Sequence, residues 1–195
     1  MMMDIQNTTN YAKQTFDGIA TENTDLHGSS YSDCTFSRCR LSSVDLTGAD
    51  FADCIFDGCE ISLPKLTGCG LHGAKFKGCK LVGADFTRCN INFFDVSFED
   101  CLIDTCNFSA LKLKRTLFLG CMVRESRFVE SVLAEADFER SDLEGTLFHG
   151  CDLKRANFRK ARNYSINPTT NDLKGATFSL PEAVSLLANL GIKLE

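Results

Sequence analysis

The sequence predicts an all-β solenoid in which the chain turns through a right angle every five residues. Large apolar residues recur at every fifth position from Phe16 to Ile91, with Thr21 as the one exception, and again from Phe98 to Phe158. This period matches neither the 3.6 residues of a helix nor the two residues of a flat strand. Phenylalanine also recurs at a spacing of twenty, which makes four five-residue sides per coil. We therefore expect a four-sided rod of about seven coils.

Residues twenty apart lie above one another in successive coils, so the spacing predicts interior columns of like side chains. The second half of the chain carries two phenylalanine columns, which we expect on opposite walls. They are Phe98, Phe118, Phe138 and Phe158 in one wall and Phe108, Phe128 and Phe148 in the other. Aliphatic residues at the intervening positions are expected to fill the remaining two walls.

Interruptions of the repeat divide the chain into five segments. Residues 1–15 are expected to form a lead-in or cap, and the first run of coils covers 16–91. A phase slip of two residues covers 92–97, a second run of coils covers 98–178, and 179–195 form a C-terminal helix and tail. The slip contains Phe93 and Phe94. These rings either pack two sub-rods together or present an exposed aromatic side chain, and packing is the preferred interpretation.

The C-terminal segment carries the signature of a short helix. Ser179, Pro181 and Glu182 read as a capping box with proline in the first turn, and Gly191 supplies a stop. An apolar stripe runs between them at helical spacing. The end of a solenoid is an open sheet edge, so we expect this helix to cap the last coil.

All 11 cysteines lie two residues before a central apolar position, a slot otherwise filled by small residues. We expect inward-facing free thiols that act as small apolar fillers, because stacked Cβ atoms about 4.8 Å apart do not suit a disulfide. His27, His72 and His149 occupy an outward slot and no CxxC is present, so no metal site is expected. Free thiols indicate a reducing compartment, and no apolar run reaches the roughly 18 residues of a membrane span. A cytoplasmic protein without membrane contact is the expectation.

Composition and motifs separate the function classes. A net charge of -5 argues against direct binding of nucleic acid. No glycine-rich phosphate loop and no convergent nucleophile and base are present, and every inward slot is filled by its own side chain. We therefore expect no enzyme, no catalytic residue and no cofactor. A binding module is the leading class.

The units Ala49-Asp50-Phe51, Ala84-Asp85-Phe86 and Ala136-Asp137-Phe138 resemble the repeats of the pentapeptide-repeat family, over residues 16–178. This resemblance implies a right-handed quadrilateral β-helix. The stretch from Asn163 to Ala183 is similar to stand-alone bacterial members that protect DNA gyrase from quinolones, albicidin or microcin, and it looks most like the albicidin-resistance type. The resemblance implies a homodimer joined at its C-terminal ends that resembles B-form DNA and competes for the DNA-binding saddle of this type II topoisomerase. Quinolone-protecting relatives often carry long protruding loops, which are missing here, so quinolone protection is the less expected variant.

Two sets of residues are candidates for these contacts. The candidate dimer interface comprises the helical stripe and the tail: Ala183, Leu186, Leu187, Leu190, Ile192 and Leu194. The candidate acidic partner-binding face comprises outward carboxylates within fifteen residues: Glu130, Glu135, Asp137, Glu139, Asp142 and Glu144. These carboxylates either imitate phosphates or form an ordinary solvated surface, since several cations follow between 154 and 162.

The alternative function is a structural or scaffold rod that binds another protein partner. Four outward apolar residues are a candidate surface for such a contact. They are Leu102, Leu117, Leu119 and Met122.

Overall fold

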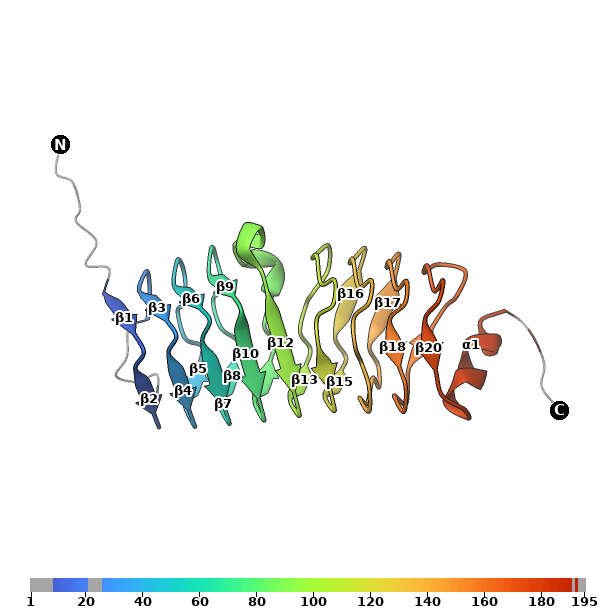
Figure 1. The fold of residues 1–195 in the computed structure, drawn as a ribbon, viewed down its shortest axis with the longest axis horizontal. Helices are drawn as coiled ribbons and strands as arrows, with labels where there is room; N and C mark the ends of the chain where they lie inside the picture. Colours follow the sequence, from blue (N-terminus) through green and yellow to red (C-terminus); the bar gives the residue numbers. More distant parts are fainter. Residues whose placement is uncertain (1–8, 21–25, 191, 193–195) are drawn as a thin grey trace.

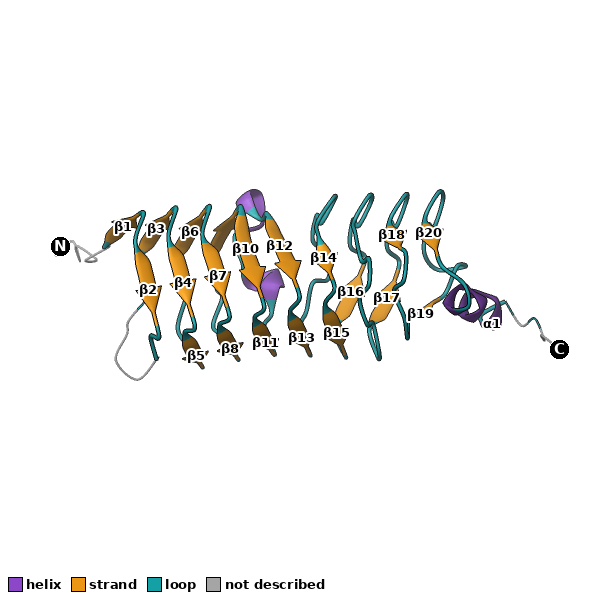
Figure 2. Ribbon diagram, turned by 60° about the horizontal axis from the view of Figure 1, so that its bottom comes forward, coloured by secondary structure: helices purple, strands orange, loops and turns teal. Residues whose placement is uncertain are grey.

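The computed structural model describes residues 9–20, 26–190 and 192, which form an elongated rod (Figure 1). The chain forms a right-handed quadrilateral β-helix of about eight coils, with a short C-terminal helix. The coils contribute short strands, bridges and helical turns to four walls, and within a wall the paired strands are parallel (Figure 2). The sequence predicted the fold correctly and the number of coils to within one.

Walls 1 and 2 hold the first two sides of each coil. The strands of wall 1 are β1 (Asn10–Ala12), β3 (Ser30–Ser32), β6 (Asp50–Ala52) and β9 (Gly70–His72), and bridges link Lys112, Val132, Asp152 and Asp172 farther along. The strands of wall 2 are β2 (Thr15–Asp17), β4 (Thr35–Ser37), β7 (Ile55–Asp57), β10 (Ala74–Lys77), β12 (Val96–Glu99), β14 (Phe118–Leu119), β18 (Asn157–Phe158) and β20 (Thr177–Phe178). Since β1 pairs with β3, the repeat already begins within the segment expected to be a lead-in.

Walls 3 and 4 complete each coil. The strands of wall 3 are β5 (Arg40–Ser42), β8 (Glu60–Ser62), β11 (Lys80–Val82), β13 (Leu102–Asp104) and β15 (Met122–Arg124). Wall 4 contains the 3-10 turn η2 (Phe86–Arg88) and the strands β16 (Arg127–Val129), β17 (Leu147–His149) and β19 (Ser165–Ile166). A second 3-10 turn, η3 (Ile91–Phe93), takes the place of a wall 1 strand in one coil. The last coil is followed by η4 (Glu182–Val184) and α1 (Ser185–Ala188).

Aromatic rings fill the interior of the rod. On wall 2 a continuous stack runs from Phe16 to Phe178, with centroid separations between 4.7 and 5.2 Å. On wall 4 a second stack runs from Phe86 to Phe148 at 4.7 to 5.0 Å. Rings of these opposite walls meet edge to face across the interior, as Phe118 and Phe128 do at 5.6 Å. Stacked and edge-to-face rings are favourable arrangements, so the columns that seal the core also hold the coils in register.

The corners of the rod depend on one backbone conformation. The second residue after each central position has a positive φ at nearly every described corner, between 46° and 76°. Glycine occupies some of these corners, but Thr105 (φ 52°) and Glu125 (φ 46°) illustrate the many that are not glycine. The left-handed region costs an L-residue with a Cβ roughly 1–2 kcal/mol, and β-branched residues suit it least.

The slot two residues before each centre is more than a space for small side chains. At some corners the slot N–H is bonded within its own turn, as Ala136 N–H is to Leu133 O at 3.0 Å. At others it donates to a side chain in the next coil, as Cys59 N–H does to Cys79 Sγ at 3.4 Å. The same Cys79 thiol donates to the Phe56 carbonyl at 3.3 Å.

Serine, threonine and asparagine take over this role in the C-terminal half. Cys106 N–H donates to Ser126 Oγ at 3.1 Å, and Cys151 N–H donates to Asn171 Oδ1 at 3.0 Å. Buried backbone groups need partners, and at these positions the side chain in the slot supplies one to the N–H of the coil below. The expectation of thiols acting only as apolar fillers was therefore incomplete.

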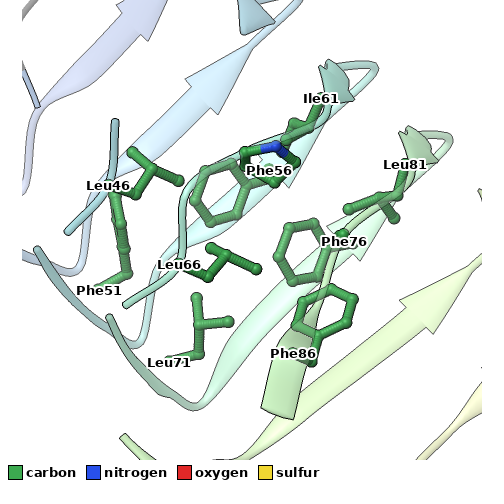
Figure 3. A pocket seen from close by; sticks show the side chains of 11 residues that line it. Leu46, Phe51, Phe56, Ile61, Leu66, Leu71, Phe76, Leu81 and Phe86 are labelled. Atoms are coloured by element: carbon green, nitrogen blue, oxygen red, sulfur yellow. The ribbon is translucent and has the colours of Figure 1, made fainter. Parts of the chain in front are cut away.

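A packing defect lies where the aromatic columns change walls. Aromatic residues face inward from walls 1 and 2 at Phe51 and Phe56, and from walls 2 and 4 after Phe86. Between them Leu66 and Leu71 leave a cavity of about 20 Å³, lined only by apolar side chains and Pro64 (Figure 3). A space of this size and character holds no ligand.

We expect Thr105→Asn to raise the free energy of unfolding by about 0.5–1 kcal/mol, because asparagine accepts a positive φ better than a β-branched residue does. Equilibrium urea unfolding measures this gain. Thr67→Asn is the matched control, since Thr67 is exposed on a coil and does not have a positive φ. An equal gain in both variants would contradict the assigned role of the corner.

We expect Cys79→Ala to lower the free energy of unfolding by about 1–3 kcal/mol, because it leaves the Cys59 N–H and the Phe56 carbonyl without partners. Cys79→Ser restores both hydrogen bonds and is expected to recover most of the loss. Cys69→Ala is the matched control, because the slot N–H of the coil below, at Ala49, is bonded to Leu46 O at 3.0 Å. Equal losses at positions 69 and 79 in urea unfolding would refute the hydrogen-bonding role.

Candidate partner-binding surfaces

The six carboxylates of the candidate acidic face lie on four different walls. Fifteen residues make three sides of a coil, so the set turns around the rod instead of gathering on one side. Glu130 lies on wall 4 and Glu135 lies on wall 1 of the next coil. Asp137 and Glu139 lie on wall 2, and Asp142 and Glu144 lie on wall 3. The structure therefore does not bring these residues together on a single face.

Several of these charges are also neutralised by cations. Glu135 forms ion pairs with Arg115 Nε at 2.8 Å and Lys114 Nζ at 3.6 Å, and the hydrogen bond from Arg115 holds the pKa of this carboxyl below its usual value. Glu144 lies 3.8 Å from Arg124 Nε. All three cations come from the coil below, twenty or twenty-one residues earlier in the chain.

Asp142 is buried, contrary to the expectation that it faces outward. Asp142 is 7% exposed. Its carboxylate lies 3.4 Å from Arg162 Nε and accepts a hydrogen bond from Asn163 Nδ2 at 2.9 Å. Both partners belong to the next coil, where the regular spacing changes near the C-terminal end. Their side chains fold over Asp142 and remove it from any partner-binding surface.

Sequence reasoning missed a different group of carboxylates, here called the N-terminal acidic cluster. It lies on walls 1 and 2 of two adjacent coils. Its members are exposed and have no ion pair among the described residues: Asp33, Asp50, Asp53 and Asp57. The carboxylates of Asp50 and Asp53 occupy the space that side chains at Gly70 and Gly73 would fill. The available signal was the charge of residues 1–97, with 8 basic and 12 acidic residues, which gives a net charge of -4.

The phase slip both joins the two runs of coils and protrudes from wall 1 (Figure 1). Phe94 packs against the core, with its ring centroid 6.0 Å from that of Phe86. Ile91 was expected to be a central inward residue, but it is 63% exposed because the chain makes the turn η3 there instead of a strand. Beside it lies a depression of about 230 Å³, whose lining includes Leu111 and Lys112.

The outward apolar residues form a small patch across the corner of walls 2 and 3. Leu102 pairs in register with Met122 on wall 3, and Leu117 and Leu119 flank Phe118 on wall 2. Leu117 and Met122 are each 41% exposed. This exposure is compatible with a contact surface of modest size.

The C-terminal end differs from its expected form. The helix α1 has four residues, and Ser179 does not cap it: Ser179 Oγ accepts a hydrogen bond from Lys160 N–H at 3.0 Å instead. The last coil is covered nevertheless, because Leu186 packs against the core and Ser185 Oγ donates to the Tyr164 carbonyl at 3.3 Å.

The candidate dimer interface lies partly outside this covered region. Ala183 and Leu187 are partly buried, whereas Leu190 and Ile192 are 46% and 49% exposed, and Leu194 lies outside the described residues. The nearby Tyr164 hydroxyl is buried without a hydrogen-bond partner in the described chain. The exposed apolar side chains at this end are those a partner would have to cover.

The interior thiols have no geometry for metal chemistry. Among the described residues, no three or more His, Cys, Asp or Glu side chains are grouped so that they could hold a metal ion. All 11 cysteines are free and buried, and burial raises the pKa of Cys106 to about 12, so this thiol stays protonated at neutral pH. No helix among the described residues combines the length and the apolar character that crossing a bilayer requires.

Comparisons with known proteins address the fold and the family. Over 95% of this chain and 100% of the other, the structure is similar to a trypsin-treated variant of QnrB1, a plasmid-mediated fluoroquinolone resistance protein, with a TM-score of 0.64 and 17% identity. HetL, a pentapeptide repeat protein involved in heterocyst differentiation regulation in the cyanobacterium Nostoc, is similar over 86% of this chain and 84% of its own, with a TM-score of 0.53 and 22% identity. No curated protein sequence matches the chain.

The family follows from the sequence match. The model of the Pentapeptide repeat region matches residues 29–92 and 91–167, well over half of the chain. These ranges contain the stacked coils, the left-handed corners and the inward slots described above. The chain therefore belongs to the pentapeptide-repeat family.

Proposed function

We propose that this protein is a non-enzymatic binding protein that occupies the DNA-binding surface of a type II topoisomerase, DNA gyrase, and protects it from a small-molecule or peptide inhibitor. The observation that carries the proposal is the rigid rod with unpaired carboxylates on adjacent coils of walls 1 and 2. Proteins that bind DNA attract its phosphates largely by charge, so regularly spaced carboxylates on a rod can compete for the same cations. The likeness to QnrB1 supports this target class.

The N-terminal acidic cluster is the better candidate surface for this mimicry. Its four carboxylates lie on neighbouring coils and have no ion pair within the part of the chain that the structure describes, whereas Glu135, Asp142 and Glu144 are paired. Glu130, Asp137 and Glu139 remain as unpaired members of the originally expected set, on two different walls. The eleven buried free thiols support a reducing location such as the cytoplasm.

A scaffold rod that binds another protein is the second candidate function. The observation that favours it is the exposed apolar patch of Leu102, Leu117, Leu119 and Met122, which DNA mimicry does not use. The likeness to HetL supports a regulatory binding role for a rod of this shape.

We expect the purified protein to restore supercoiling by gyrase in the presence of albicidin or a fluoroquinolone. Removing three charges from the N-terminal acidic cluster (Asp50→Asn, Asp53→Asn, Asp57→Asn) is expected to raise the protein concentration needed for protection at least tenfold. The reason is the loss of attraction to cations of the DNA-binding surface, and added salt should weaken the wild type in the same direction.

Two further triple variants make this experiment specific. Asp104→Asn, Glu125→Gln and Glu130→Gln remove equal charge from walls 3 and 4 and are expected to retain protection. Glu135→Gln, Asp137→Asn and Glu139→Gln test the originally expected acidic residues. Equal loss in all three variants would attribute the effect to net charge, and absence of any gyrase effect in the wild type would favour the scaffold function.

We expect a two-chain assembly joined at the C-terminal ends. Leu190→Asp together with Ile192→Asp should reduce the mass measured by light scattering to that of one chain, because charges would replace the exposed apolar side chains at this end. Leu117→Asp with Met122→Asp is the control and should leave the mass unchanged. A wild-type protein with the mass of a single chain at tens of micromolar would contradict the assembly.

A further inference from the structure

A hollow of about 440 Å³ lies in the C-terminal half of the rod, at the corner between walls 1 and 2. It is here called the basic hollow. Its lining side chains come from four successive coils: Lys114, Ala134, Glu135, Lys154, Arg155, Lys174 and Gly175. Ala134 and Gly175 stand in columns that otherwise hold long charged side chains. Their small size leaves the hollow open between the longer neighbours.

The charge of the basic hollow is opposite to that of the whole protein. Four of its lining side chains are cationic, and the single lining carboxylate, Glu135, is already paired with Lys114 and Arg115. Lys154 is paired with Asp172 at 3.0 Å and more distantly with Asp152 at 3.6 Å. A protein with a net charge of -5 therefore concentrates positive charge around one concave surface.

Two cations of the basic hollow have no carboxylate partner within the described part of the chain. Arg155 and Lys174 are both exposed, and neither forms an ion pair there. They lie on adjacent coils, about 4.8 Å apart along the rod, at neighbouring corner positions. Among the described residues, the coil that contains Gly175 is the last one and is followed by η4 and α1. The guanidinium fork and the ammonium group are thus available to one ligand.

The arrangement selects for a ligand with several negative charges. A single carboxylate would satisfy Arg155 but would leave Lys174, on the adjacent coil, without an ion-pair partner among the described residues. Guanidinium groups bind phosphate oxygens through two parallel hydrogen bonds, and ammonium groups serve as point charges beside them. The spacing of the coils places these cations along a line, which suits a chain of linked phosphates.

We propose that the basic hollow binds a small ligand with linked phosphate groups, through Lys114, Lys154, Arg155 and Lys174. Inorganic polyphosphate and the phosphate chain of a nucleotide both present linked phosphate groups of this kind. This inference is independent of the proposed action on gyrase, because it uses a different half of the rod.

Titration calorimetry of the full chain with inorganic triphosphate at low ionic strength tests the proposal. We expect saturable binding of one triphosphate per chain. Arg155→Asn with Lys174→Gln should weaken the affinity at least tenfold. Asparagine is chosen because position 155 has a φ of 57°, and urea unfolding verifies that the variant remains folded. Lys75→Gln with Lys77→Gln removes two exposed cations of wall 2 and should leave the affinity unchanged.

A variant that makes the hollow more positive tests the proposal in the opposite direction, by strengthening the binding. Glu135→Gln removes the lining carboxylate and should tighten triphosphate binding at least threefold, whereas Asp57→Asn, in the N-terminal half, should not. ATP is titrated in parallel: equal affinity supports recognition of the phosphate chain alone, and tighter binding supports a nucleotide. Absence of saturable binding would overturn the proposal. Equal weakening by the Arg155→Asn, Lys174→Gln variant and by the Lys75→Gln, Lys77→Gln control would overturn it as well. Displacement of triphosphate by duplex DNA at a lower concentration would overturn it in favour of a nucleic-acid backbone site.

Discussion

The structure depends on a left-handed corner that recurs every five residues. A right-angle turn at the second residue after each centre directs the next central side chain inward and the flanking residues outward. Because the turn is the same at each corner, every fourth side lies above its predecessor, and parallel hydrogen bonds, ring stacks and side-chain ladders follow from that superposition. The cost of a positive φ at residues such as Thr105 is therefore distributed over the whole rod and is offset by the contacts between coils.

The sequence predicted the solenoid, its four sides and its inward slots, because these properties follow from a period of five residues. It predicted less well wherever the period changes. Ile91 continues the count of five but lies outside, since the two additional residues of the slip are accommodated by a 3-10 turn at that position. Asp142 occupies an outward slot but is covered by Arg162 and Asn163, where the spacing changes again. A one-dimensional count contains no information about these local adjustments.

The candidate acidic face shows a second limit of sequence reasoning. Residues close together in the chain, such as Glu130 and Asp142, are placed around the rod, whereas residues twenty apart are placed side by side. Cations that neutralise Glu135 and Glu144 are consequently about one coil away, at Arg115 and Arg124. Surface chemistry on a solenoid has to be assessed along its columns. The N-terminal acidic cluster becomes visible in this way.

The phase slip preserves the orientation of the two halves about the long axis. Phe76 and Phe98 stack at 5.2 Å across it, so each wall continues on the far side in the same direction. Wall 1 therefore carries carboxylates at Asp50 and Asp53 near one end and ammonium groups at Lys154 and Lys174 near the other. This wall has an electrical polarity along its length. An elongated molecule with opposite charges at its two ends would be attracted to it in one direction and repelled in the reverse one.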